Sequence, residues 1–262
     1  MRTATPEPSP LDRRGDLRVP AITAWFWVLK GLSTALGEST SDFLVHRLDP
    51  PVAVVIGFVL FAVALGAQLA MRRYWAPTYW FAVVGVGVFG TMAADVVHVG
   101  FGVPYFVSVA LGAAVMAVLF VAWFRSESTL SIHTIFSTRR ELYYWATVVV
   151  TFALGTAVGD LTAVTFGLGY LTSAVLFAVL IAVPSIGYRF LRWNAVACFW
   201  AAYVLTRPLG ASLADWMGKS TADGGLGWGP GPVSVTLAAM IVAGVAVVTA
   251  TRSDVQVPSP IG

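Results

Sequence analysis

Four aspartates supply most of the chemistry that this sequence could perform. Each follows a tryptophan by fifteen residues and a glycine by five, inside a stretch that is otherwise apolar. The four copies read Trp27, Gly37 and Asp42; Trp80, Gly90 and Asp95; Trp145, Gly155 and Asp160; and Trp200, Gly210 and Asp215. A carboxylate is costly inside an apolar segment and usually marks a function there. The aspartates are therefore the first candidates for a functional site.

The helix face that carries each aspartate holds further polar residues. At about 100° per residue, the tryptophan, the aspartate and the positions 7 and 11 residues after the tryptophan share one sector of a helix. These positions add Glu38 to the first copy and Arg207 to the fourth, and His98 lies three residues beyond Asp95. Carboxylate oxygens with some imidazole nitrogen suit Mn²⁺, Fe²⁺ or Mg²⁺.

Carboxylates from equivalent positions of four repeats would crowd together. Crowded carboxylates cannot all stay ionised unless a cation is bound. Either a cation or protons must therefore bind there. We predict a transport site for a cation or protons at Glu38, Asp42, Asp95, Asp160, Asp215 and Arg207. We predict a metal site at Glu38, Asp42, Asp95, Asp160, Asp215 and His98.

Each of these features also has a structural interpretation. The aspartates could cap the turns after their helices or accept hydrogen bonds from a neighbouring repeat, although four carboxylates exceed what capping needs. The motif tryptophans are typical of membrane-interface anchors or packing wedges, and the motif glycines are typical of close helix contacts. A solvated histidine near the outer surface is the simpler interpretation of His46 and His98.

Two cations lie within the apolar stretches, Lys30 and Arg207. Lys30 is close enough to one end of its helix for its ammonium to reach the interface along its flexible stem. Arg207 lies deeper, where an unpartnered guanidinium costs at least ~2.5 kcal/mol. We expect Glu38 to be its partner, because Arg207 and Glu38 lie 7 and 11 residues after their tryptophans, one turn apart on the shared helix face. The first and fourth repeats also become neighbours if the repeats close into a ring.

The composition places these residues in a lipid bilayer. Of the 262 residues, 58% are hydrophobic and 11% are charged, whereas about a quarter of a soluble domain is charged. The basic residues fall in short loops rather than in one patch, which argues against a nucleic-acid partner. The sequence has no phosphate-binding glycine loop and no serine, cysteine or paired-histidine motif, so neither an enzyme nor a nucleotide-driven pump is predicted.

Each repeat is long enough for two membrane crossings and their turns. We therefore predict an all-α membrane protein with eight transmembrane helices in four parallel two-helix repeats. The predicted transmembrane domain is 20–250, with repeats at about 20–74, 75–128, 139–193 and 194–250, between a disordered cytoplasmic tail (1–19) and a cytoplasmic C-terminal tail (251–262). Because every repeat enters the membrane in the same direction, a quasi-symmetry axis is expected along the membrane normal.

The basic residues predict the orientation of the chain. If the N-terminal tail and every second loop lie on one side, that side carries twelve cations and the opposite side two. The twelve are Arg2, Arg13, Arg14, Arg18, Arg72, Arg73, Arg125, Arg139, Arg140, Arg189, Arg192 and Arg252; the two are Arg47 and Lys219. By the positive-inside rule both termini are cytoplasmic, and the predicted location is the cell (inner) membrane.

The four copies together resemble a family of bacterial membrane proteins built from four tandem repeats of unknown function. The resemblance covers about residues 20–250 and rests on two spans and one tryptophan per repeat, with segments 154–160 (LGTAVGD) and 206–211 (TRPLGA) similar to the family's signatures. It implies a multi-pass bacterial membrane protein and no established activity. Glu38 stands where the other copies have Thr or Ala, so the first repeat is expected to be specialised.

From these patterns we predict a transporter or channel for a divalent metal cation that uses a ring of intramembrane carboxylates. The alternative is a non-transporting integral membrane protein, whose carboxylates hold helices together and whose loops bind a partner. In both cases the lipid bilayer surrounds the chain, and the only cofactor considered is a divalent metal ion.

Overall fold

The structure is a computed structural model and describes residues 17–256. Within this range the chain forms eight α-helices and no β-strand, which confirms the all-α prediction. The helices are α1 (Ala24–Arg47), α2 (Pro50–Ala70), α3 (Ala76–Asp95), α4 (Tyr105–Glu127), α5 (Thr138–Asp160), α6 (Tyr170–Phe190), α7 (Ala195–Gly218) and α8 (Pro230–Thr251). Two π-helical turns, η2 (Val96–Gly100) and η4 (Leu161–Thr165), continue α3 and α5. The 3-10 turns η3 (Ile132–Thr134) and η5 (Thr221–Asp223) lie in loops.

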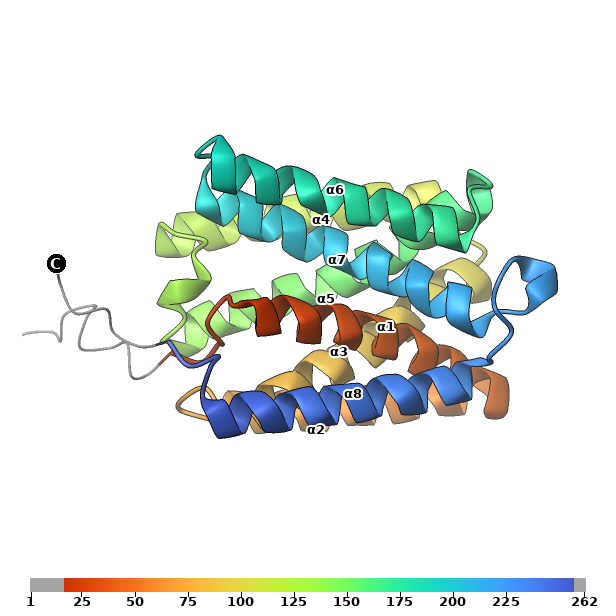
Figure 1. The fold of residues 1–262 in the computed structure, drawn as a ribbon, viewed down its shortest axis with the longest axis horizontal. Coiled ribbons are helices and arrows are strands. Elements are labelled where there is room, and N and C mark those ends of the chain that lie inside the picture. The colour runs from red at the N-terminus through yellow and green to blue at the C-terminus, as the bar shows by residue number, and fades with distance from the viewer. Residues whose placement is uncertain (1–16, 257–262) are drawn as a thin grey trace, which may run out of the picture.

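The helices lie side by side along one long axis, and both ends of the described chain lie at the same end of the bundle (Figure 1). The backbone N–H of Ala21 donates to the carbonyl of Asp254 at 2.7 Å, and the Gln256 side chain donates to the carbonyl of Pro20 at 3.4 Å. Local sequence sets the helix starts: Thr23 and Ser137 accept hydrogen bonds from the first turns of α1 and α5, as N-cap residues do.

The four motif helices form a closed inner circuit. Helix α1 contacts α3 and α7, and α5 contacts the same two helices. The motif glycines lie at these contacts: a Cβ added at Gly37 would come within 2.8 Å of the backbone of Gly87, and one added at Gly210 would overlap Thr34. The glycines therefore allow the close helix contacts that were predicted for them.

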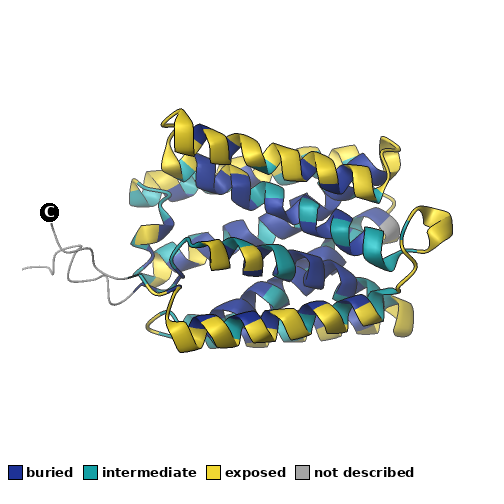
Figure 2. Ribbon diagram, in the orientation of Figure 1, coloured by how far each residue is buried: buried dark blue, intermediate teal, exposed yellow. Residues whose placement is uncertain are grey.

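The four remaining helices cover this inner circuit from outside. Helices α2, α4 and α6 pack chiefly against the motif helix of the next repeat, α3, α5 and α7, and α8 packs against α1. The second helix of each repeat thus packs on the first helix of the following repeat, and the second helix of the last repeat packs on the first helix of the first repeat. The outward faces of α2, α4, α6 and α8 are exposed and apolar (Figure 2), with residues such as Val55, Val118 and Val242 at their surface.

Seven of the helices in the described chain are long and apolar enough to cross a membrane. Helix α1 is not among them; its sequence contains Lys30, Glu38 and Asp42 together with several Ser, Thr and Gly residues. Helix α1 is nevertheless part of the inner circuit, and Lys30 and Glu38 are buried. The charges that lower its hydropathy are therefore turned toward the other motif helices.

The tryptophan ends of the motif helices form an aromatic core. Trp80, Trp145 and Trp200 are buried there, and Trp27 packs against the same cluster while partly buried. The ring of Phe26 lies 5.9 Å from that of Trp80, centroid to centroid. The motif tryptophans therefore fill the interior of the bundle, in line with the packing interpretation and not with an exposed interface belt.

The predicted disordered tail, residues 1–19, overlaps the described chain at residues 17–19. Leu17 and Val19 are buried, and the Arg18 guanidinium donates to Glu141 at 2.6 Å. Apolar anchors and an ion pair therefore hold this short stretch on the bundle. Residues 1–16 and 257–262 lie outside the described part of the chain.

Candidate functional site

A fully buried arginine joins the four motif helices. The guanidinium of Arg207, on α7, donates to Glu38 Oε2 at 2.7 Å, to Thr156 Oγ1 at 2.7 Å and to Thr91 Oγ1. It also donates to the carbonyl of Thr34 at 3.0 Å. The expected pair of Arg207 with Glu38 is thus confirmed as a contact. One side chain of the fourth repeat reaches polar atoms of the other three.

Local sequence makes room for this guanidinium. Gly155 has no side chain where the Arg207 stem passes, and a Cβ there would overlap that stem. Pro208, inside α7, has no N–H to give to the preceding turn, which loosens the helix beside the arginine. The Thr91 and Thr156 hydroxyls also approach backbone carbonyls of their own helices, at 3.1 and 3.2 Å, so their hydrogens and lone pairs are both engaged.

A second cation binds two of the motif aspartates. The ammonium of Lys219 lies 2.6 Å from Asp42 Oδ2 and 3.5 Å from Asp215 Oδ1. Lys219 is the first residue after α7, so it joins the last turn of that helix to α1. Burial alone would lower the pKa of Lys219, but the carboxylates of Asp215 and Asp42 outweigh it and hold that pKa well above its usual value. Lys219 is therefore protonated and positively charged at neutral pH.

Asp95 and Asp160 have a different environment. Each is the last residue of its α-helix, directly before a π-helical turn. Neither side chain forms a salt bridge or a hydrogen bond with another side chain in residues 17–256. When ionised, both would be repelled by the carboxylates of Glu38 and Asp42.

The charges at this end of the bundle do not balance. The five carboxylates that the sequence singled out face two cations, Arg207 and Lys219. All five are buried or half-buried, with Glu38 and Asp215 about 4 and 5% exposed. Bringing this many negative charges together needs protons or further cations.

The predicted metal centre is not assembled. No three His, Cys, Asp or Glu side chains among the described residues are placed to hold a metal ion. The physical reason is that the protein's own cations engage Glu38, Asp42 and Asp215. His98 instead approaches the carbonyl of Val103 at 3.1 Å.

The ring nitrogen of His46 meets the backbone carbonyl of Asp42 at 2.6 Å. Neither histidine joins a carboxylate cluster in the part of the chain that is described. Both are therefore explained by local contacts with backbone carbonyls.

Lys30 does not reach the interface, so that prediction is wrong. The residue is 1% exposed, and its ammonium lies 4.3 Å from the ring centre of Phe152 and 4.2 Å from that of Tyr203. Its nitrogen has no hydrogen-bond partner within residues 17–256. The two aromatic faces replace the water that a snorkelling lysine would have found.

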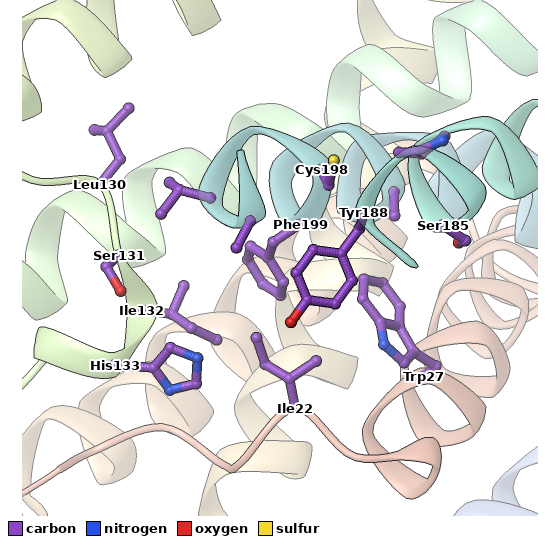
Figure 3. Close-up of a pocket in the computed structure, with 14 residues that line it drawn as sticks. Ile22, Trp27, Leu130, Ser131, Ile132, His133, Ser185, Tyr188, Cys198 and Phe199 are labelled. Carbon is purple, nitrogen blue, oxygen red and sulfur yellow. The ribbon is translucent and has the colours of Figure 1, made fainter. Parts of the chain in front are cut away.

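The tryptophan end contains a separate cavity of about 460 Å³. Figure 3 shows Trp27, Tyr188 and Phe199 on one side of it and His133 with Ile132 on the other. Its walls come from the starts of α1 and α7, from α6 and from the loop around η3. It therefore lies far along the bundle from the aspartates, which stand near the opposite ends of the motif helices.

The role of Lys219 was not predicted from the sequence, which indicated only a loop residue. The available signal was its spacing: Lys219 stands four residues after Asp215, where an i,i+4 pair meets on a helix. Thr91 and Thr156 occupy the motif position that Glu38 has in the first copy, but they were not predicted as partners of Arg207. Their shared position with Glu38 in the motif was the signal for that role.

Four stretches of the chain match the family described as a Repeat of Unknown Function (DUF347), at residues 25–74, 78–129, 143–192 and 198–254. Together they cover more than half of the sequence, and each contains one copy of the tryptophan, glycine and aspartate motif. No curated protein and no solved structure matches the chain.

Proposed function

We propose that this chain, which belongs to the DUF347 repeat family, is a multi-pass membrane transporter for a cation. The observation that carries this proposal is the imbalance of charge at one end of the motif helices. Five carboxylates face two cations there, and Asp95 and Asp160 form no salt bridge within the described chain. A transported cation or protons would supply the missing positive charge.

All eight helices span the membrane in this proposal. The seven apolar helices would face lipid or one another, and α1 would cross with its charges turned inward. The two ends of the described chain are adjacent, which agrees with an even number of crossings. The arginine bias then puts both termini in the cytoplasm of a bacterial inner membrane.

The repeats would enter the membrane in parallel, with a quasi-symmetry axis along the membrane normal. The closed circuit of α1, α3, α5 and α7 supports this arrangement. It would bring the four aspartates to a similar depth toward the outer leaflet. The aromatic core would then lie toward the cytoplasm.

The path along the axis is closed in this conformation. Arg207 is fully buried and bonded to three other helices, and below it the rings of Phe26, Tyr79 and Tyr144 pack in the aromatic core. A carrier that opens to one side of the membrane at a time fits this arrangement better than an open channel. In such a carrier Asp95 and Asp160 would receive the cation first, because no protein cation pairs with them.

Divalent metal ions are the first class of cation to test, because oxygen ligands suit them. A metal with more than two protein ligands would need Asp42 or Asp215 to leave Lys219. Proton exchange on the same carboxylates would couple transport to a pH gradient.

A second candidate is a non-transporting membrane protein with structural carboxylates. It is favoured by the two close ion pairs, Arg207 with Glu38 and Lys219 with Asp42. In that case the aspartates hold helices together, and the loops bind a partner.

Flux measurements separate the two candidates. Purified protein in proteoliposomes would be tested with Mn²⁺, Fe²⁺, Mg²⁺ and Na⁺, each with and without a pH gradient, against liposomes without protein. Transport predicts protein-dependent uptake of at least one cation and a rise in the melting temperature with that cation, since a ligand that binds only the folded state stabilises it. Absence of both effects for every cation would favour the structural candidate.

A further inference from the structure

We propose that Lys219 is a tethered cation that closes the aspartate end of the bundle, and that a free inorganic cation entering this end displaces its ammonium from Asp42 and Asp215. The inference rests on the proposed cation transport and names how the site would be regulated. The lysine would act as a latch, which holds two carboxylates until a mobile cation competes for them.

The backbone after α7 presents the lysine to these carboxylates. The N–H of Leu226 donates to the carbonyl of Trp216 at 2.7 Å, and that of Gly227 donates to the carbonyl of Lys219 at 2.9 Å. Gly224 and Gly227 have positive φ angles of 82° and 74°, which a side chain would oppose. The segment 219–229 is thus folded back on the end of α7, where Figure 1 shows it projecting from the bundle.

The ammonium is placed so that it can leave. The Lys219 side chain is 31% exposed, whereas that of Asp215 is 5% exposed and that of Asp42 is 15% exposed. A released lysine would therefore return to water on a flexible stem, while Asp215 would stay buried and Asp42 half-buried. By contrast, the Arg207 guanidinium is fully buried and has partners on three helices, so it cannot leave in the same way.

Two buried hydroxyls at this level have no partner within the described chain. They are Ser41 Oγ, next to Asp42, and Ser212 Oγ, three residues before Asp215. Ser212 Oγ lies against Gly159 of α5, the residue before Asp160. A hydroxyl left without a hydrogen bond inside a protein is costly, and the water carried by a hydrated cation at this end of the bundle is a partner that either hydroxyl lacks in the described chain.

The latch can be observed directly because the chain contains two lysines, Lys219 and the fully buried Lys30. The test is acylation of Lys219 by a sulfonated succinimidyl ester, followed by mass spectrometry of the detergent-solubilised full-length protein. Labelling would be compared in MnCl2, MgCl2 and NaCl against choline chloride at the same ionic strength. Ion pairing suppresses the reactive free amine, whose amount changes about tenfold for each pKa unit.

We expect slow labelling in choline chloride and a rise of about tenfold with the cation that the protein recognises. Asp42→Asn should raise labelling of Lys219 without any added cation. The control is Asp49→Asn, which changes the exposed N-cap residue of α2 and should leave labelling unchanged. A gel-filtration profile like that of the unchanged protein shows that each variant is folded. Lys219→Gln should increase flux at low cation concentration, since no tethered cation competes.

Acylation of Lys219 tests the latch, and cation flux in proteoliposomes tests the proposed transport function. A cation-dependent rise in labelling without flux of any cation would support the latch and refute transport. Flux of a cation that leaves Lys219 labelling unchanged would refute the latch and leave transport standing. Equal labelling of the unchanged protein, Asp42→Asn and Asp49→Asn in every salt would also refute it.

Discussion

Repeats one and four differ from repeats two and three at the same motif aspartate. In α1 and α7 the aspartate pairs with Lys219, and the α-helix continues past it to Arg47 and Gly218. In α3 and α5 the aspartate is the last α-helical residue, and a π-helical turn follows. The same spacing of residues therefore serves two carboxylates that share one ammonium and two that have no salt bridge in the described chain.

Two further motif positions divide the repeats in the same way. Glu38 and Arg207 replace the uncharged residues that the other copies have at these levels, and they neutralise each other. Repeats two and three provide Thr91 and Thr156 to the same guanidinium. π-Helical turns are rare and are frequent at functional sites. The unpaired aspartates and the π-helical turns thus occur in the same two repeats, which are the proposed entry point of the cation.

The largest effect on stability is expected in repeats one and four, whose charged residues form ion pairs. Arg207→Met leaves Glu38 buried without its cation, and breaking one partner of a buried pair typically costs about 3–5 kcal/mol. The double variant Arg207→Met/Glu38→Gln should recover part of this loss, because no unpaired charge remains. Chemical unfolding in detergent measures both. If the double variant is no more stable than Arg207→Met, Glu38 is not the principal partner.

A smaller loss of stability is expected from a change in repeat three, where Gly155 makes room for the Arg207 side chain. Gly155→Ala would place a Cβ on the stem of Arg207, and overpacking of this kind costs about 1–3 kcal/mol. The matched control is Gly66→Ala, where a Cβ meets no atom within 4 Å and helix propensity favours Ala. Equal melting temperatures for the two variants would contradict the tight contact.

The smallest effect concerns Lys30, a cation that repeats two and three replace with Val83 and Val148 at the equivalent position. Lys30→Met removes an ammonium without a hydrogen-bond partner in the described chain, and apolar replacement of such a group is nearly neutral or stabilising. We expect a change within about 1 kcal/mol, or a gain, with flux retained. Loss of flux at unchanged stability would instead assign Lys30 a role in transport.

Much of the architecture could be predicted from the sequence, because a repeated motif fixes which helices are equivalent. The ring of motif helices and the contact of Arg207 with Glu38 followed from that equivalence and from the cost of a buried guanidinium. The surroundings of Lys30 could not be predicted, since Phe152 and Tyr203 come from two other repeats. Nor could the absence of a metal ligand set among the described residues, because it depends on where the flexible Lys219 side chain settles.

The most direct test compares the two pairs of aspartates in cation flux. Asp95→Asn/Asp160→Asn and Asp42→Asn/Asp215→Asn would be reconstituted beside the Asp49→Asn control, with flux measured for the cation that the unchanged protein carries. We expect the first variant to lose flux while keeping its melting temperature, since its aspartates have no salt bridge to lose. We expect the second to lose stability, because Lys219 loses both of its partners. Normal flux in Asp95→Asn/Asp160→Asn would contradict the claim that the unpaired aspartates bind the transported cation.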